Sequence, residues 1–461
     1  MKNLYPLTPA QNMHYQWIRQ YHTQQVSGVT IAFAVKMDLD LVLLNKCIIE
    51  ETKRYGCLNL RFTEPDKNGE IKQYFKRKST NTIKILNFSD ISFEEAENAC
   101  QSLAYETFDG ADRAMYEFFL LRLPDGYNGF LAHIDHRLID SCGLAVMVKD
   151  IMALYAHYKF GADYPDALAN FEDVLIKDLD KLHNEKRYAR DKAFWDEQLE
   201  KYGEPLYSDI QGKKVLEASR KKHGDHTLRS ADIEMDNLFV AVKDYKLEPE
   251  PSKRLMDYCE EKKISFNNLL LLTMRTYLSK VNYGQEDITI ESFIARRSTH
   301  DEWTCGGSRT IMFPCRTIIN GATSFFDAAQ KVQNTQNSIY LHSNYDPELI
   351  KASIREKYGT PEHTTYESCY LTYQPLQPNA ENMNLSGIPF YFKWFANGAA
   401  TKKVYLTVTH TEDGGLNFSY HYQTASVSEK DIELFYYYMM RIVFTGTEDD
   451  SRTIESIINC V

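Results

Sequence analysis

The chain lacks a surplus of positive charge. Its 461 residues carry 53 Lys and Arg against 64 Asp and Glu, which gives a net charge of −11. Binding to nucleic acid requires clustered Lys and Arg along the phosphate backbone. An anionic membrane surface attracts basic segments in the same way. The charge therefore argues against both nucleic acid and membrane as partners.

Long apolar runs and paired cysteines are also missing. No apolar stretch approaches the roughly 20 residues that a transmembrane helix needs, and residues 1–17 turn polar and aromatic too early for a signal peptide. The 9 cysteines are scattered, and none forms a C-x-x-C pair. This pattern is typical of reduced thiols in a cytoplasmic protein rather than of a disulfide framework.

The chain does contain two regions of mixed helix and strand pattern. The first runs to about residue 170, and the second begins near residue 248 after a highly charged connection over 171–247. A chain of this length is sufficient for two ordinary domains, each with its own core. We therefore expect an α/β protein with two lobes and a cleft between them.

Within these regions the apolar periodicity predicts individual elements. Residues 30–40 alternate as a half-buried strand, and residues 41–55 have helical spacing. Residues 116–135 indicate two strands around a "PDGYNG" turn, followed by a helix from Leu144 to Tyr158. Near the C-terminus, Asp413-Gly414-Gly415 predicts a hairpin turn before a Tyr-rich final helix.

Ionisable residues cluster in "HIDHRLIDSCG", residues 133–143. The cluster matches no recognised ligand spacing, so we expect no metal site. His133 and Asp135 share one face of a strand end, where a histidine is commonly a satisfied structural group. His136, by contrast, lies where a strand gives way to a helix, and a neutral imidazole at such a tip can accept a proton from an attacking amine or hydroxyl.

Two other features have both a functional and a structural interpretation. Cys142 adjoins the cluster and could act as a nucleophile, although a cysteine entering an apolar helix more commonly packs. The segment 294–309 carries Arg296, Arg297, His300 and Trp303 without a P-loop pattern. A direct anion contact is its functional interpretation.

Several blocks of this sequence together resemble the condensation domains of nonribosomal peptide synthetases, which are related to chloramphenicol acetyltransferase. The stretch "DHRLIDS" at 135–141 resembles the family's His-His-x-x-x-Asp-Gly motif, and "CLNLRF" at 57–62 resembles Leu-Arg-x-Arg-Phe. Further similar blocks, in the family's order, are "YPLTPAQNMHYQW", "FNNLLLLTMRTYLSKVNYGQEDITI" and "EDGGLNFSYHYQT". The resemblance implies two acetyltransferase-like lobes, 1–172 and 173–461, arranged as a V with a tunnel and the active site between them.

The resemblance implies that residues 294–309 form a bridging or gating loop at the floor of the tunnel, in preference to an anion contact. It also implies roles for particular residues. His136 takes the place of the catalytic base, and Asp140 is expected to form a structural ion pair with Arg61 rather than to orient His136. The backbone from Ser141 to Gly143 is a candidate oxyanion donor. Thr372 and Tyr373 in "YLTYQ" are candidates for substrate positioning, although inward hydroxyls of a strand are commonly structural.

Three positions depart from the family pattern, namely Asn59, Asp135 and Ser141. A side chain at position 141 narrows space that glycine leaves open. The resemblance implies an acyltransferase that joins a thioester on a carrier protein's phosphopantetheine to an amine or hydroxyl. A non-catalytic module that binds carriers or recruits enzymes, and a coenzyme A-dependent acyltransferase, are the alternatives. We expect a monomer that binds no cofactor directly, either free-standing or the first module of a longer chain.

Overall fold

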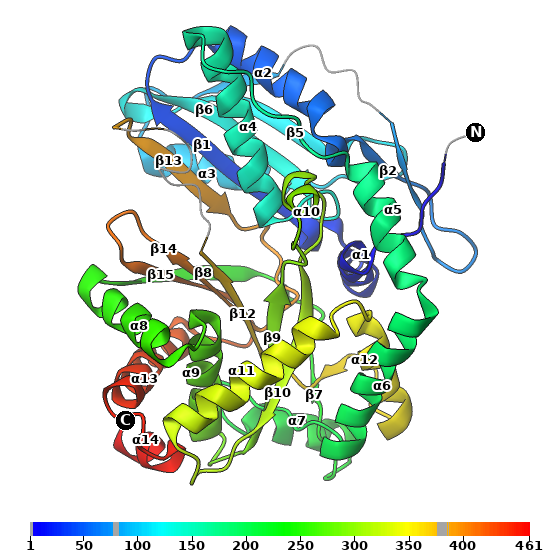
Figure 1. Cartoon of the computed structure of the whole chain (residues 1–461), viewed down its shortest axis with the longest axis vertical. Coiled ribbons are helices and arrows are strands. Elements are labelled where there is room, and N and C mark those ends of the chain that lie inside the picture. The colour runs from blue at the N-terminus through cyan, green and yellow to red at the C-terminus, as the bar shows by residue number, and fades with distance from the viewer. Residues whose placement is uncertain (1–2, 77–82, 376–384, 386) are drawn as a thin grey trace. The chain divides into compact units, whose positions relative to one another are not determined.

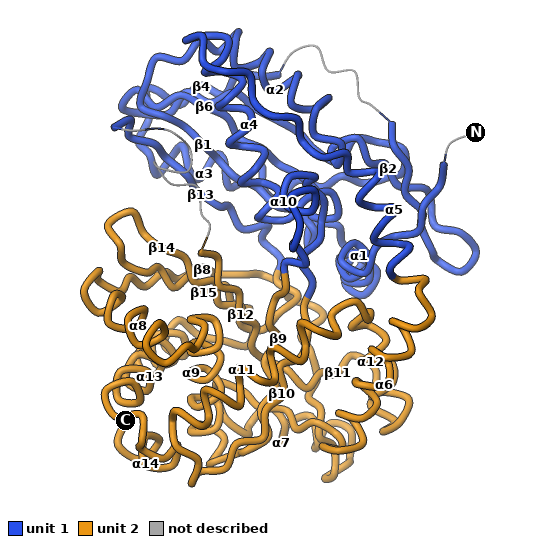
Figure 2. The backbone as a smooth tube through the Cα atoms, in the orientation of Figure 1, with its two compact units in different colours: residues 1–181, 295–311, 376–399 blue, residues 182–294, 312–375, 400–461 orange. Residues whose placement is uncertain are grey.

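The computed structural model describes residues 3–76, 83–375, 385 and 387–461. Within these ranges the chain forms two compact units, shown in different colours in Figure 2. The first contains 1–181, 295–311 and 376–399, and the second contains the remainder. The chain thus returns twice to the first unit from beyond residue 181. The domain boundary after residue 172 and the tunnel between lobes stay predictions.

The first unit is built on a five-stranded sheet with the order β13-β1-β6-β5-β4. Figure 1 labels β13, β1, β6 and β5 of this sheet. All neighbouring pairs are antiparallel except β4 and β5. The strands of this unit are β1 (Gly28–Lys36), β2 (Leu60–Phe62), β3 (Gln73–Phe75), β4 (Lys84–Asn87), β5 (Tyr116–Arg122), β6 (Tyr127–Asp135) and β13 (Phe390–Phe395). The helices are α1 (Pro9–Tyr21), α2 (Leu41–Arg54), α3 (Phe93–Leu103), α4 (Ser141–Phe160), α5 (Phe171–Leu182) and α10 (His300–Thr304).

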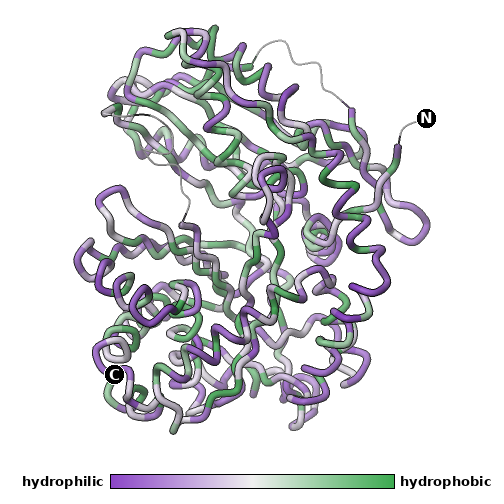
Figure 3. The backbone as a smooth tube through the Cα atoms, in the orientation of Figure 1, coloured by the Kyte–Doolittle hydropathy of each residue, from purple (hydrophilic) through white to green (hydrophobic). Residues whose placement is uncertain are grey.

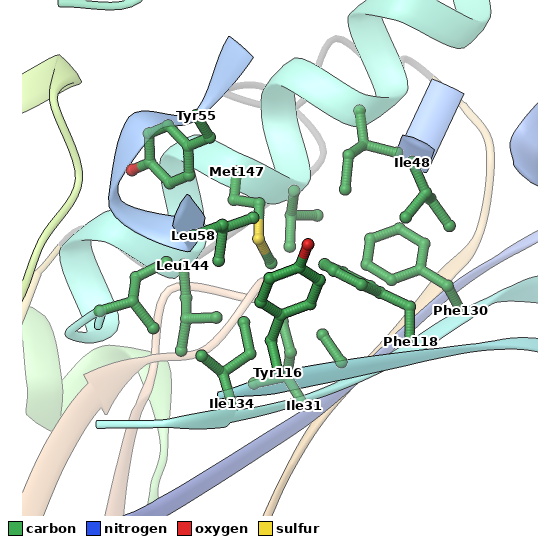
Figure 4. Packing of buried hydrophobic residues seen from close by; sticks show 14 of the residues in the cluster. Ile31, Ile48, Tyr55, Leu58, Tyr116, Phe118, Phe130, Ile134, Leu144 and Met147 are labelled. Atoms are coloured by element: carbon green, nitrogen blue, oxygen red, sulfur yellow. The ribbon is translucent and has the colours of Figure 1, made fainter. Parts of the chain in front are cut away.

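Helices cover both faces of this sheet. Ile31 and Phe33 of β1 and Phe130 of β6 pack with residues of α2 and α4, as Figure 4 shows for part of this core. The opposite face of β1, at Ala32 and Ala34, packs against α3. Residues 30–40 were predicted to form a half-buried strand; β1 is a strand, but every residue from Thr30 to Val35 is buried. The prediction of half-burial is wrong because the second helical layer comes from distant sequence.

The second unit contains a six-stranded sheet with the order β10-β9-β12-β14-β15-β8. A separate two-stranded sheet pairs β11 with β7. The strands of the second unit are β7 (Ala231–Asp232), β8 (Val240–Leu247), β9 (Asp287–Ile294), β10 (Ile311–Ile318), β11 (Thr364–Thr365), β12 (Cys369–Gln374), β14 (Val404–His410) and β15 (Leu416–Gln423). Its helices are α6 (Glu185–Tyr202), α7 (Lys214–His223), α8 (Pro249–Lys262), α9 (Phe266–Val281), α11 (Phe325–Leu341), α12 (Pro347–Tyr358), α13 (Glu429–Glu448) and α14 (Ile454–Cys460). The strands of the two sheets include the most hydrophobic stretches of the tube in Figure 3, as buried strands must.

Several predicted elements are confirmed. The turn at residues 124–126 joins β5 to β6, and α2 and α4 lie where helical spacing placed them. The hairpin between β14 and β15 turns at Gly414, whose φ of +91° suits glycine. The Tyr-rich helix α13 is not the last, because the short α14 follows it. Among the described residues, no helix is long and apolar enough to cross a membrane.

Candidate active site

His136 directly follows the C-terminal end of β6, an interior strand of the first unit's sheet. β6 lies between β1 and β5 and ends at Asp135, which is opposite Gly28 of β1. The next residue, His136, is half-buried, and its backbone N–H donates to the Ser27 carbonyl at 2.6 Å. The residue predicted to be the base is therefore fixed by its backbone on a rigid strand end, where functional side chains are commonly presented.

Asp135 organises the turn that follows the strand. Its carboxylate accepts three hydrogen bonds from Arg137, one from the backbone N–H at 2.8 Å and two from the guanidinium at 2.9 and 2.7 Å. The Ser27 hydroxyl donates to it as well, at 3.1 Å. Both charged side chains are almost completely buried. Asp135, one of the departures from the family motif, thus forms a closed ion pair beside His136.

His133 is a buried structural residue, the interpretation favoured for a histidine within a strand. Its Nδ1 lies 2.8 Å from the Thr30 hydroxyl, and its Nε2 lies 3.0 Å from the Glu106 carbonyl. Its ring stacks on Phe108 with 4.7 Å between centroids. Burial lowers the pKa of His133, since a charged imidazole is costly away from water. In the described part of the chain, no cluster of three or more His, Cys, Asp or Glu residues could hold a metal ion.

Asp140 pairs with Arg297, and the predicted pair with Arg61 is wrong. Arg297 Nη2 donates to Asp140 Oδ1 at 2.7 Å, and the two side chains are 0% and 1% exposed. Arg61 is also buried, but it donates to the carbonyls of Leu58 and Leu60. The short strand β2 directs Arg61 back onto its own backbone, whereas a loop from residues 295–311 brings Arg297 to Asp140.

Other donors complete the surroundings of the Asp140 carboxylate. It accepts from the backbone N–H groups of Gly143, Arg309 and Thr310 at 2.9, 3.0 and 3.0 Å, and from the Thr310 hydroxyl at 3.0 Å. Burial alone would raise the pKa of Asp140, but Arg297 and these donors outweigh it and lower the pKa. Asp140 is therefore a buried anion that ties the His136 turn to the segment 295–311.

A second charged network anchors the same segment to α5. Arg309 pairs with Asp178, and Lys181 pairs with Glu302 at 2.8 Å. Burial would raise the pKa of Glu302, but Lys181 and donors from Ser298 lower it to about 2. Residues 294–309 were expected to form a bridging or gating loop, and that role stays a prediction. Two arginines of this stretch, Arg297 and Arg309, bind carboxylates of the first unit itself.

The first turn of α4 was predicted to donate hydrogen bonds to an oxyanion. Asp140 is the N-cap of this helix, and its carboxylate already takes the Gly143 N–H, so that group is committed to the cap. Ser141 and Cys142 occupy the two preceding helical positions, where backbone N–H groups have no partner within the helix. The prediction for Gly143 as a donor is wrong for this geometry, and the oxyanion role of Ser141 stays a prediction.

The remaining candidate residues have partners of their own. Burial raises the pKa of Cys142 to about 11, which leaves little thiolate for nucleophilic attack near neutral pH. Thr372 and Tyr373 belong to the second unit, where the Thr372 hydroxyl accepts from Tyr405 at 3.0 Å and the Tyr373 hydroxyl lies 2.6 Å from His410 Nε2. The role predicted for these two residues in substrate positioning stays a prediction.

The sequence analysis missed His14, which contacts His136 directly. The two imidazole rings stack with 4.2 Å between centroids and 22° between planes. His14 belongs to α1, in the block "YPLTPAQNMHYQW" that contributed to the resemblance. Its position on the buried side of an amphipathic helix was readable from the sequence, but its neighbour across the fold was not.

Comparison with known proteins shows which family this sequence resembles. The sequence model of the family described as "Condensation domain" matches residues 1–457. Surfactin synthase subunit 1 of Bacillus subtilis (strain 168) is 24% identical over 465 residues, a match covering 98% of this chain and 12% of that protein. A plipastatin synthase of the same organism is 20% identical over 446 residues, with 96% of this chain and 16% of that protein covered. The chain thus spans less than a fifth of the length of these two relatives.

Solved structures share the fold over almost the whole chain. The first condensation domain of the calcium-dependent antibiotic synthetase, in complex with a substrate analogue, superposes with a TM-score of 0.78 at 16% identity, covering 98% of this chain and 99% of that one. The starter condensation domain of rhizomide synthetase, in complex with C8-CoA, gives a TM-score of 0.79 at 14% identity, covering 98% and 97%. The mixed α/β fold is therefore confirmed as that of condensation domains, and this chain belongs to the condensation-domain family.

Proposed function

We propose that this domain forms an amide or ester bond between a carrier-bound acyl thioester and an amine or hydroxyl acceptor, with His136 as the base. The acceptor's lone pair attacks the thioester carbonyl, and the carbon–sulfur bond then breaks. The acceptor loses one proton to His136, and the departing thiolate takes up one proton to become a thiol. The donor is an acyl group on the phosphopantetheine arm of a carrier protein.

The observation that carries this proposal is the placement of His136. A thioester is already activated, so catalysis requires orientation of the two reactants, a proton acceptor and stabilisation of the oxyanion. His136 lies one residue beyond a fully paired strand, and its turn is held by the buried ion pairs of Asp135 and Asp140. This arrangement supports a base whose position is fixed before substrates arrive.

A non-catalytic role is the second candidate, and Ser141 favours it. Ser141 opens α4 where the motif has glycine, and its side chain is half-buried. A module of that kind would bind carrier proteins or recruit another enzyme without turning over. The buried anchoring of the His136 turn would then maintain only the fold.

Mass spectrometry of carrier proteins distinguishes these functions. Acyl-loaded and aminoacyl-loaded carriers are incubated with the domain, and an acyl-coenzyme A donor replaces the acyl carrier in a parallel reaction. A condensed species that requires both the domain and the acyl carrier supports the proposal. Product only from the coenzyme A donor supports the coenzyme A-dependent alternative. Carrier binding without any product supports the non-catalytic module.

A further inference from the structure

The helix α1 presents His14 against His136 in a fixed position. The helix begins with a capping box between Thr8 and Gln11. The side chain of Gln11 donates to the Arg137 carbonyl at 3.2 Å and to Gln73 Oε1 at 2.8 Å. α1 is therefore bonded to the residue that directly follows His136, so the helix and the catalytic turn share one framework.

His14 is itself held in place. Its side chain is buried, with the residue 4% exposed, and its ring meets Trp17 edge-on with 5.0 Å between centroids and 84° between planes. The same ring stacks on His136 at 4.2 Å. A ring held by its own helix and buried in this way offers one flat face to the half-buried imidazole of His136.

We propose that His14 is a positioning residue for His136, whose stacked ring fixes the plane of the imidazole and shields one of its faces from water. The inference rests on the proposed role of His136 as the base. Fixing the plane restricts rotation of the ring, so the nitrogen that accepts the proton keeps one direction. Shielding a face disfavours the charged imidazolium and so favours the form that can accept a proton.

Two carboxylates on the His136 turn are already paired with arginines. On its own turn, Asp135 is closed in an ion pair with Arg137. Asp140 is closed in an ion pair with Arg297 of the segment 295–311. His14 of α1 is a titratable group in contact with the His136 ring, and the uncharged Ser27 carbonyl, at the end of the 3-10 turn Gln24–Ser27, accepts from the His136 backbone N–H. Neither carboxylate is left to stabilise an imidazolium without first giving up its arginine.

Three variants at position 14 test the inference. His14→Phe keeps a flat ring, His14→Leu keeps the volume without a flat face, and His14→Ala removes both. Condensation kinetics should show His14→Phe within about threefold of wild type, and both His14→Leu and His14→Ala reduced about tenfold or more in kcat with KM nearly unchanged. Wild-type kcat in a folded His14→Leu or His14→Ala, a loss in KM instead, or His14→Phe as slow as His14→Ala would overturn the inference.

A second readout does not depend on catalysis. The ring proton of His136 is assigned in NMR spectra by its loss in His136→Ala and is then followed with pH in each variant. The titration midpoint should rise in His14→Ala, because water reaches the uncovered face, and should stay within a few tenths of a pH unit in His14→Phe. An unchanged midpoint in a folded His14→Ala contradicts the shielding. If wild type makes no product, the proposed function fails, while this titration still decides the contact.

Discussion

At the scale of single residues, the site depends on a carboxylate in an apolar interior. Asp140 accepts five hydrogen bonds. Its ion-pair partner, Arg297, could not be predicted from the sequence. The motif indicated that Asp140 would pair with an arginine, and "CLNLRF" offered Arg61 nearby in the pattern. The true partner lies 157 positions along the chain, and no local spacing could have selected it.

Breaking the pair should cost stability and show coupling. Asp140→Ala and Arg297→Ala should each lower the free energy of unfolding by about 3–5 kcal/mol, because each leaves a buried charge without its partner. The double variant should cost less than the sum of the two. Denaturant unfolding of the four proteins measures this, with an Asp140→Ala and Arg61→Ala cycle as the control. Additive losses for Asp140 and Arg297, or stronger coupling to Arg61, would be inconsistent with the geometry.

The ionised state of Asp140 should also make the stability of the protein depend on pH in the acid range. Because the pKa of folded Asp140 is lowered, its contribution to stability is complete above the unfolded pKa of about 3.9 and is lost as pH falls further. Stability of wild type should therefore fall more steeply than that of Asp140→Asn between about pH 5 and pH 2. The exposed Asp163→Asn serves as control and should follow wild type. Parallel curves for wild type and Asp140→Asn would refute the ionised state of Asp140.

Ser141 tests whether the departure from glycine limits turnover. Ser141→Gly should keep or raise the condensation rate, because glycine restores the residue that the family motif has at this position and removes a side chain from the start of α4. The thermal midpoint should be measured alongside the rate, since glycine weakens the first turn of a helix by up to about 1 kcal/mol. A clear loss of rate in a folded variant would instead assign the Ser141 hydroxyl its own role.

At the scale of elements, the segment 295–311 locks the first unit together. Ile139 bridges to Gly307, and both Gly306 and Gly307 have positive φ. A Cβ on Gly307 would lie 2.0 Å from a ring carbon of Phe171, so the backbone approaches α5 more closely than any other residue permits. The loop was recognisable from its sequence. Its close packing depends on side chains that are distant in the sequence, such as Asp140 and Phe171.

Comparing alanine variants of two glycines distinguishes the cost of close packing from the cost of backbone strain. Gly307 and Gly126 share a φ of +80°, but nothing lies within 4 Å of a Cβ added to Gly126. Both Ala variants carry the strain of a left-handed conformation, and only Gly307→Ala collides with Phe171. Gly307→Ala should therefore lose about 1–3 kcal/mol more unfolding free energy than Gly126→Ala in chemical denaturation. Equal losses would mean that Phe171 moves aside without cost.

At the scale of the whole molecule, periodicity and motif order predicted the fold class and most elements. They did so because strands such as β6 and helices such as α4 are specified by their own apolar pattern. The second helical layer on β1, the return of residues 295–311 and 376–399 to the first unit, and the His14 stack all join distant segments. Each arises from tertiary packing, which a local pattern does not encode.

The central claim is that His136 is the base of a condensation reaction. The decisive measurement is the rate of carrier-bound product formation by wild type and by His136→Ala, followed by mass spectrometry, with the thermal midpoint of each. We expect product from wild type and a rate about 10²–10⁴-fold lower for His136→Ala. The midpoint should change little, because the side chain is only half-buried. A folded His136→Ala protein that turns over at the wild-type rate would contradict the account.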